Sequence, residues 1–494
     1  MVAVSAPLPL KSQKMPSYGS HPLLGALPEL EKDQLGALTR AVEQHGDVVR
    51  LASHLKSLVV VRNPADVQHI LVDNNRNYSK NTRGYEMLRM LLGNGLVTSE
   101  GDFWLRQRRI AQPAFHKERI AAFASVMTRA AEDTLARWQA PMAAGQDVDV
   151  AAEMMRLTLT VVGQTLLSVD LSGDSDEVGR ALTVALEYTN YRITHLFSAP
   201  RFIPTRANRE FAHAVKVLDG VVLDVIKQRR QGEQKMDLVS MFMHARDDVT
   251  GGAMDDQQLR DEVMTMFLAG HETTAMALTW TLYLLTQHPE VEARVRAELA
   301  EVLGERTPVL EDLRRLPYLE RVLKEAIRLY PPAWIMGRYA LHDDVVGGYT
   351  VPRGSYVFIS PYLTHRHPGL WKDPERFDPD RFLPERMEGM PKYAYFPFSA
   401  GQRKCIGDGF AMMEAELVLA TLLPRVRFAI SPNARVELEP LVTLRPKHGM
   451  KMLLTPTNGE VAQRVPTVST SSSEQSLAAA ARAGGCPFHA MLGR

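Results

Sequence analysis

One cysteine stands out as a residue able to do chemistry. Cys405 is one of two cysteines in 494 residues, and it lies in the run 396–407 between the apolar Phe398 and Ile406 and near Arg403. A buried thiolate is costly unless a cation or metal compensates its charge, and the helical pattern that follows favours an anionic sulfur at its N-terminus. No cysteine or histidine stands nearby at zinc-ligand spacing, so a single axial thiolate on a haem iron is the better interpretation.

The same run contains a longer pattern, F-x-x-G-x-R-x-C-x-G, filled by Phe398, Gly401, Arg403, Cys405 and Gly407. This pattern resembles the haem-binding loop of the cytochrome P-450 superfamily, the haem-thiolate monooxygenases. The resemblance implies haem b as the cofactor and Cys405 as the axial ligand of its iron. It also implies cofactor contacts by Phe398, Arg403 and Gly407. The alternative is a buried, inert cysteine in a glycine-rich loop.

A second motif lies in the middle of the longest expected helix, over 255–287. A glycine within a helix costs about 1 kcal/mol relative to alanine, and a glutamate in an apolar stretch is costly unless it is needed. The residues Ala269, Gly270, Glu272 and Thr273 match the family pattern A-G-x-[DE]-T. By this resemblance Ala269 and Gly270 border the cofactor and leave room for dioxygen, while Glu272 and Thr273 deliver protons. The alternative is a kinked core helix with a hydrogen-bonded glutamate.

Two further residues are suited to bind a carboxylate. Trp104 and Arg108 are four positions apart, so on a helix an indole N–H and a guanidinium share one face. The family uses such a W-x-x-x-R pair to hold a haem propionate, which assigns that role here, and Arg338 falls where the family often places another propionate ligand. Without the cysteine loop, a solvated basic face with a buried tryptophan is an equal alternative.

A third family motif is structural. Glu325 and Arg328 form an E-x-x-R pair near the end of an expected helix, and the resemblance implies that a second arginine downstream joins them in a buried network. Arg376 and Arg381 are both candidates, and the F-x-P-x-R-F context favours Arg381.

The substrate pocket can be outlined only by resemblance. We expect its walls to come from the region 78–102, which reads as irregular, from Ala269, from the segment after the E-x-x-R helix and from a turn near the C-terminal end. The residues expected there are Ala333, Trp334, Ile335, Met336 and Thr443.

The elements that must position these residues are mostly helical. Apolar periodicity predicts helices over 33–44 and 64–71, several across 120–245, and others over 255–287, 316–330 and after residue 407, with strands over 47–51 and 57–61. The fold class is therefore mainly α with small β-sheets, and the resemblance places haem between the long helix and the helix after the cysteine. We expect one domain over 21–456, with flexible segments at 1–20 and 457–494, the latter holding Cys486, for which we find no function.

Composition limits the partners. Lys plus Arg number 58 and Asp plus Glu 57, a net charge of +1, which gives no reason to expect nucleic acid or an anionic membrane as a partner. The N-terminal segment 1–11 is too short and too polar to span a bilayer, and prolines interrupt it. We expect a soluble, cytoplasmic, bacterial-type monomer.

The resemblance implies insertion of one oxygen atom of O2 into a C–H bond. No flavin, NAD or iron–sulfur motif is visible, so electrons from NAD(P)H must arrive through separate partners, a ferredoxin or flavodoxin-type donor and its reductase. A peroxide-driven enzyme and a non-enzymatic haem sensor or carrier are alternatives, and both leave Glu272 and Thr273 unexplained. A long-chain fatty acid is the favoured substrate, with Lys56 or Arg50 as a carboxylate anchor, and terpenoids or steroids come next.

Overall fold

The computed structural model describes residues 14–21, 24–51, 57–170, 175–195, 198–232 and 235–457. In it, the helix expected over 255–287 is α12 (Asp256–Gln287). Asp255 caps it: its side chain accepts from the Gln258 N–H, and the Gln258 side chain accepts from the Asp255 N–H. At about 1.5 Å per residue, its 32 residues span roughly 48 Å. Side chains on nearly every face of α12 are buried, so neighbours surround it.

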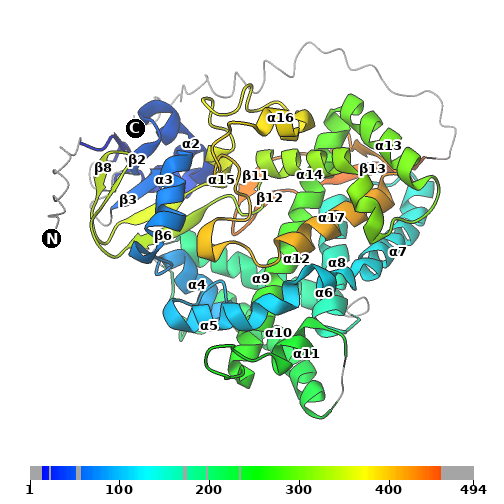
Figure 1. Cartoon of the computed structure of the whole chain (residues 1–494), viewed down its shortest axis with the longest axis horizontal. Coiled ribbons are helices and arrows are strands. Elements are labelled where there is room, and N and C mark those ends of the chain that lie inside the picture. Colours follow the sequence, from blue (N-terminus) through cyan, green and yellow to red (C-terminus); the bar gives the residue numbers. More distant parts are fainter. Residues whose placement is uncertain are drawn as a thin grey trace, which may run out of the picture. The chain divides into compact units, whose positions relative to one another are not determined.

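Those neighbours are other helices (Figure 1). The described helices are α1 (Leu27–Lys32), α2 (Gln34–His45), α3 (Pro64–Gln68), α4 (Arg83–Leu92), α5 (Gly101–Ala111), α6 (Lys117–Ala121), α7 (Ala124–Ala143), α8 (Val150–Val162), α9 (Ser175–Thr194), α10 (Arg206–Arg230), α11 (Leu238–His244), α12, α13 (Pro289–Leu303), α14 (Pro317–Leu329), α15 (Pro361–Thr364), α16 (Pro384–Met387) and α17 (Asp408–Leu422). Short π-turns follow α3 at His69–Asp73 and α8 at Gly163–Leu167.

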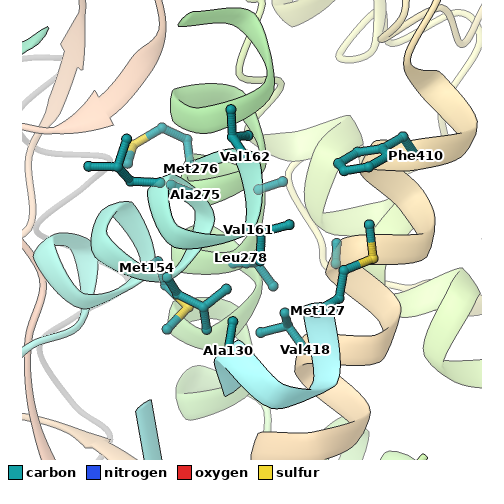
Figure 2. Close-up of a cluster of buried hydrophobic side chains, with 14 of the residues drawn as sticks. Met127, Ala130, Met154, Val161, Val162, Ala275, Met276, Leu278, Phe410 and Val418 are labelled. Carbon is teal, nitrogen blue, oxygen red and sulfur yellow. The ribbon is translucent and has the colours of Figure 1, made fainter. Parts of the chain in front are cut away.

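The largest core includes apolar side chains of α7, α8, α12 and α17, and Figure 2 shows some of them. Apolar side chains from the four helices pack together, which removes apolar surface from water and fixes α17 against its neighbours. The labelled residues are Met127, Ala130, Met154, Val161, Val162, Ala275, Met276, Leu278, Phe410 and Val418.

The strands form small sheets. They are β1 (Ser17–Tyr18), β2 (Val48–Leu51), β3 (Leu58–Val61), β4 (Tyr78–Ser79), β5 (Val148–Asp149), β6 (Met336–Ala340), β7 (Asp344–Val346), β8 (Tyr349–Val351), β9 (Tyr356–Ile359), β10 (Val426–Ile430), β11 (Leu438–Pro440), β12 (Leu444–Pro446) and β13 (Lys451–Pro456). The largest has the order β1-β2-β3-β9-β6-β4, and the others are β10-β13-β5, β11-β12 and β7-β8. The expected class, mainly α with small sheets, is confirmed.

Two local expectations were wrong. Residues 17–18 are not flexible, because they pair with β2 as the strand β1. The region 78–102 is not irregular throughout, because residues 83–92 form α4, which packs against α9 and ends at Gly93 with φ of 63°. Lys56, residues 1–13, most of the expected C-terminal segment and Cys486 lie outside the described residues. Among the described residues, no helix combines the length and apolar character needed to cross a membrane.

Candidate haem and substrate site

A cavity of about 310 Å³ lies between α12, the loop before α17, and α17 itself. From α12 it is lined by Thr265, Met266, Ala269, Gly270, Thr273, Thr274 and Ala277, and from the loop and α17 by residues that include Phe398, Arg403, Cys405, Gly407, Phe410 and Ala415. Residues of both chemical motifs of the sequence therefore line one cavity.

The cysteine loop is built to hold its sulfur toward this space. The backbone N–H of Cys405 donates to the Phe398 carbonyl at 2.9 Å, and α17 begins three residues later. Gly401 has φ of 64°, and a Cβ atom there would collide with the carbonyl oxygen of Leu71 in the π-turn after α3. Only glycine fits both conditions, so this position fixes the course of the loop.

The Cys405 side chain is accessible, and it is one of the residues that line the cavity. Burial raises the pKa of its thiol, although a hydrogen bond from the Gly407 N–H and the charges of Arg108 and Lys404 oppose the rise. A cation on the cavity side is therefore needed to keep the sulfur anionic, and a haem iron would be one. The donor set fits a single thiolate ligand, with Cys405 as that ligand.

Positive charges gather beside the cavity. Lys80, Arg108 and Arg403 line it, and Arg338 is buried next to Lys80 and Arg403. Glu100 is the carboxylate that pairs with this cluster, at 3.1 Å from Arg403. Burial lowers the pKa of Lys80 well below its ordinary value, and the charges of Arg338 and Arg403 lower it further. Burial also lowers the pKa of Arg403 to about 10.

Such a cluster is stable only with further anions, because buried cations of one sign repel and are poorly solvated. Two haem propionates would supply them. Trp104 contributes its ring, over which the Arg403 guanidinium carbon lies at 3.8 Å, and Arg108 donates to the Lys404 carbonyl at 2.9 Å. The residues fit a haem whose propionates face this edge.

Lys80 was missed by the sequence analysis. It carries no motif, and only the pairing of β4 with β6, in which Ser79 lies opposite Tyr339, brings it beside Arg338. That pairing joins segments about 260 positions apart, so no local pattern reveals it.

The α12 motif divides between two surroundings. Ala269, Gly270 and Thr273 line the cavity, and the Thr273 hydroxyl donates to the Ala269 carbonyl at 2.6 Å. Glu272 does not line it: its carboxylate is buried and accepts a hydrogen bond from the Thr443 hydroxyl at 2.8 Å. Burial raises the pKa of Glu272, and the Thr443 bond opposes this.

The expected pocket wall is only partly on the cavity. Ala333 and Met336 line it. Trp334 instead packs in the core beside the large sheet and donates to the Leu441 carbonyl at 2.9 Å, and Ile335 packs against the same core. Thr443 points to Glu272 rather than to the cavity. Trp334 and Thr443 depart from the expected pocket wall because their polar groups bond to partners outside the cavity lining, the Leu441 carbonyl and the Glu272 carboxylate. Ile335 departs from it because it packs against the same core as Trp334.

The structural network is complete. Glu325 and Arg328 are fully buried, with 2.6 Å between Arg328 Nε and Glu325 Oε2. Arg381 Nε lies 3.2 Å from Glu325 Oε1, whereas Arg376 offers only its backbone carbonyl to the network.

Comparison with known proteins agrees with this geometry. The family model described as Cytochrome P450 matches residues 15–454. Cyclooctatin synthase of Streptomyces melanosporofaciens is 39% identical over 86% of this chain and 92% of its own. Pentalenene oxygenase of Streptomyces avermitilis is 34% identical over 88% and 96%. Cyclooctat-9-en-7-ol 5-monooxygenase of Streptomyces melanosporofaciens is 35% identical over 84% and 89%.

A solved structure is also similar. The crystal structure of cytochrome P450DA heme domain has a TM-score of 0.83 and 30% sequence identity, and the match covers 90% of this chain and 98% of that one. Haem b, electrons that originate in NAD(P)H and reach the haem through redox partners, and monooxygenase activity are confirmed as expected for such a chain. The chain belongs to the cytochrome P450 family of monooxygenases.

Proposed function

We propose that this enzyme hydroxylates a cyclic terpenoid that carries no carboxylate. The observation that supports this is the distribution of charge in the cavity. Its cationic lining residues are those of the propionate cluster and the cysteine loop, whereas most of its other lining side chains are apolar. These apolar residues include Leu96, Val97, Met266, Ala269, Pro332, Ala333 and Met336, and hydroxyl groups come from Ser399 and from threonines.

The fatty acid favoured by the sequence analysis finds no support here. Arg50 is exposed on β2 and is not among the cavity-lining residues, and Lys56 lies outside the described residues. The names of two relatives, Pentalenene oxygenase and Cyclooctat-9-en-7-ol 5-monooxygenase, refer instead to pentalenene and to the alcohol cyclooctat-9-en-7-ol, and neither compound is an acid. An apolar wall without an anion anchor suits such ring compounds.

The roles of the side chains follow from where they lie. Cys405 would hold the haem iron, and Trp104, Arg108, Arg338 and Arg403, together with Lys80, would hold the propionates. When bound, the haem supplies the activation of O2 and the transfer of one oxygen atom to a C–H bond. Phe398, Gly407, Ala269 and Gly270 leave a flat space for it.

Protons reach the cavity through Glu272 and Thr273. The raised pKa of Glu272 favours its protonated form, which can give a proton to a neighbouring oxygen. Its side chain must turn from Thr443 toward the cavity to do so. The hydrogen bond from Thr443 therefore keeps the carboxyl group off the cavity until the side chain turns. The Thr273 hydroxyl, which lines the cavity and is bonded to the Ala269 carbonyl, would pass the proton on.

The electron donor would be a soluble ferredoxin or flavodoxin-type protein with its reductase, meeting a monomeric enzyme in the cytoplasm. A peroxide-driven reaction is the outcome to exclude, by comparing turnover with hydrogen peroxide alone and with redox partners.

The test has two parts. The reduced, haem-loaded protein with carbon monoxide should show the strongly red-shifted Soret band of thiolate ligation, and Cys405→Ser should lose it while keeping its haem. Cyclic terpenes and their alcohols should then shift the Soret band of the wild type and be hydroxylated. A fatty acid that binds more tightly than its matched fatty alcohol would contradict the proposed substrate class.

A further inference from the structure

The segment that joins α4 to α5, residues 93–100 and called the wall loop here, forms part of the cavity through Leu96 and Val97. Two of its backbone N–H groups are bound by acidic residues of α12. The Asn94 N–H donates to Asp261 Oδ2 at 2.7 Å, and the Leu96 N–H donates to Glu262 Oε2 at 3.0 Å. Neither carboxylate lines the cavity.

The other side of the wall loop is bound through its carbonyl groups. Lys80 Nζ donates to the Val97 carbonyl at 2.9 Å, and Arg403 donates to the Ser99 carbonyl at 3.0 Å. These two residues belong to the cluster that would hold the propionates. The loop is therefore hydrogen-bonded to α12 on one side and to the residues that would hold the propionates on the other.

The loop also lies unusually close to α12. A Cβ atom at Gly95 would collide with the Thr265 hydroxyl and lie 2.6 Å from the Asp261 carbonyl oxygen. Gly95 does not have a positive φ angle. Glycine is therefore needed at this position because the loop backbone lies close to α12, and not because of an unusual backbone angle.

We propose that Glu262 is a positioning residue that sets how far Leu96 and Val97 project into the cavity, and thereby which substrates fit and which carbon is oxidised. This deepens the proposed function and rests on it, because it assumes that substrate occupies this cavity. Glu262 itself is fully buried and touches the site only through the loop backbone.

The state of the carboxyl group supports this role. Burial raises the pKa of Glu262 to about 8, so near pH 7 a neutral carboxyl accepts the Leu96 N–H bond. Its second oxygen has no hydrogen-bond partner within the described part of the chain. The Leu96 bond is thus what Glu262 contributes, and glutamine can replace it whereas leucine cannot.

The first test uses haem-loaded enzyme and two probes that bind the iron. Imidazole is small, whereas 4-phenylimidazole also carries a ring that reaches the cavity wall. We expect Glu262→Leu to change the spectral Kd of 4-phenylimidazole by about two- to tenfold, the range of one net hydrogen bond, with the imidazole Kd unchanged. Glu262→Gln should match the wild type for both probes.

A matched control is Glu416→Leu on α17. It removes another buried carboxyl group, whose pKa burial raises to about 8 and which is not among the cavity-lining residues. It should leave the ratio of the two Kd values unchanged. An equal change in Glu416→Leu and Glu262→Leu would overturn the inference, since the effect would then be general loosening.

A second pair of variants tests the loop if Glu262→Leu folds poorly. Gly95→Ala should push the wall loop off α12 and alter the 4-phenylimidazole Kd and the ratio of hydroxylated products. Gly84→Ala in α4 is the control, because the nearest atom to its Cβ would be Thr82 Oγ1 at 3.8 Å.

The two failures are distinguishable. A wild-type protein whose Soret band responds to imidazole but to no cyclic terpene would overturn the proposed function. A wild type that responds, with wild-type Kd ratios in both Glu262→Leu and Gly95→Ala, would overturn the role of Glu262 alone.

Discussion

Three ionisable side chains at or near the cavity are buried, and their burial affects their charge. Lys80, Glu262 and Glu272 are all buried. Burial lowers the pKa of Lys80 and raises the pKa of the two glutamates, so that it favours the neutral form of each side chain. Lys80 lines the cavity, and Glu262 and Glu272 belong to α12, which forms one of its walls. Groups whose protonation the protein controls in this way are expected around a site that must bind anions and move protons.

Glu262 should make stability depend on pH. Its pKa rises from 4.5 to about 8 on folding, with burial as the main cause and the charge of Asp261 adding to it. Between those values the folded chain holds a proton that the unfolded chain has lost, so the free energy of unfolding falls as pH rises, by at most about 1.4 kcal/mol per pH unit. Below pH 4.5 the stability is fully present.

Glu262→Gln removes this titration. Urea unfolding of the variant at pH 5 and pH 8 should therefore show a gain over the wild type that grows with pH, while the exposed Glu290→Gln tracks the wild type at both values. Parallel curves for Glu262→Gln and wild type would contradict the shift.

At the scale of elements, the cysteine loop depends on a π-turn far away in the sequence. Gly401→Ala should lose haem and the carbon monoxide band, because a Cβ there meets the Leu71 carbonyl and its φ of 64° is unfavourable for alanine, by about 1–2 kcal/mol. Gly389→Ala isolates the collision, since Gly389 has φ of 78° with no atom within 4 Å. Haem content per chain is the measurement, and equal content in both variants would argue against the Leu71 contact.

Some elements were predictable and others were not. The capping box of α12 and the helix after Cys405 follow from local residue types, and both form as expected. The helix α4 was missed because it is short, contains Gly84 and is stabilised by packing against α9.

The direction of side chains was the harder part of the site. Glu272 and Thr443 are each in a recognisable segment, yet their hydrogen bond joins residues 171 positions apart. Trp334 faces the core because its indole N–H finds the Leu441 carbonyl. Residue type and spacing locate such positions, whereas tertiary packing decides where they point.

At the scale of the whole molecule, the site is assembled from distant parts of the chain. Segments near residues 80, 104, 270, 336 and 405 all border one cavity. A cofactor that binds the folded chain and not the unfolded one stabilises such an assembly, so defects in packing far from the cavity should appear as loss of haem.

The buried network of Glu325, Arg328 and Arg381 offers the sharpest case. Arg381→Gln removes one of the two guanidinium groups that bind the buried Glu325 carboxylate and leaves Arg328 as the other. The loss of such a charged hydrogen bond costs about 1.5–3 kcal/mol. Arg376→Gln is the control, because Arg376 joins the network only through its backbone carbonyl. Thermal unfolding with haem absorbance should show a much lower Tm and less haem in Arg381→Gln, and a near wild-type Tm in Arg376→Gln. The reverse order would place Arg376 in the network and show that the stabilising charge comes from there.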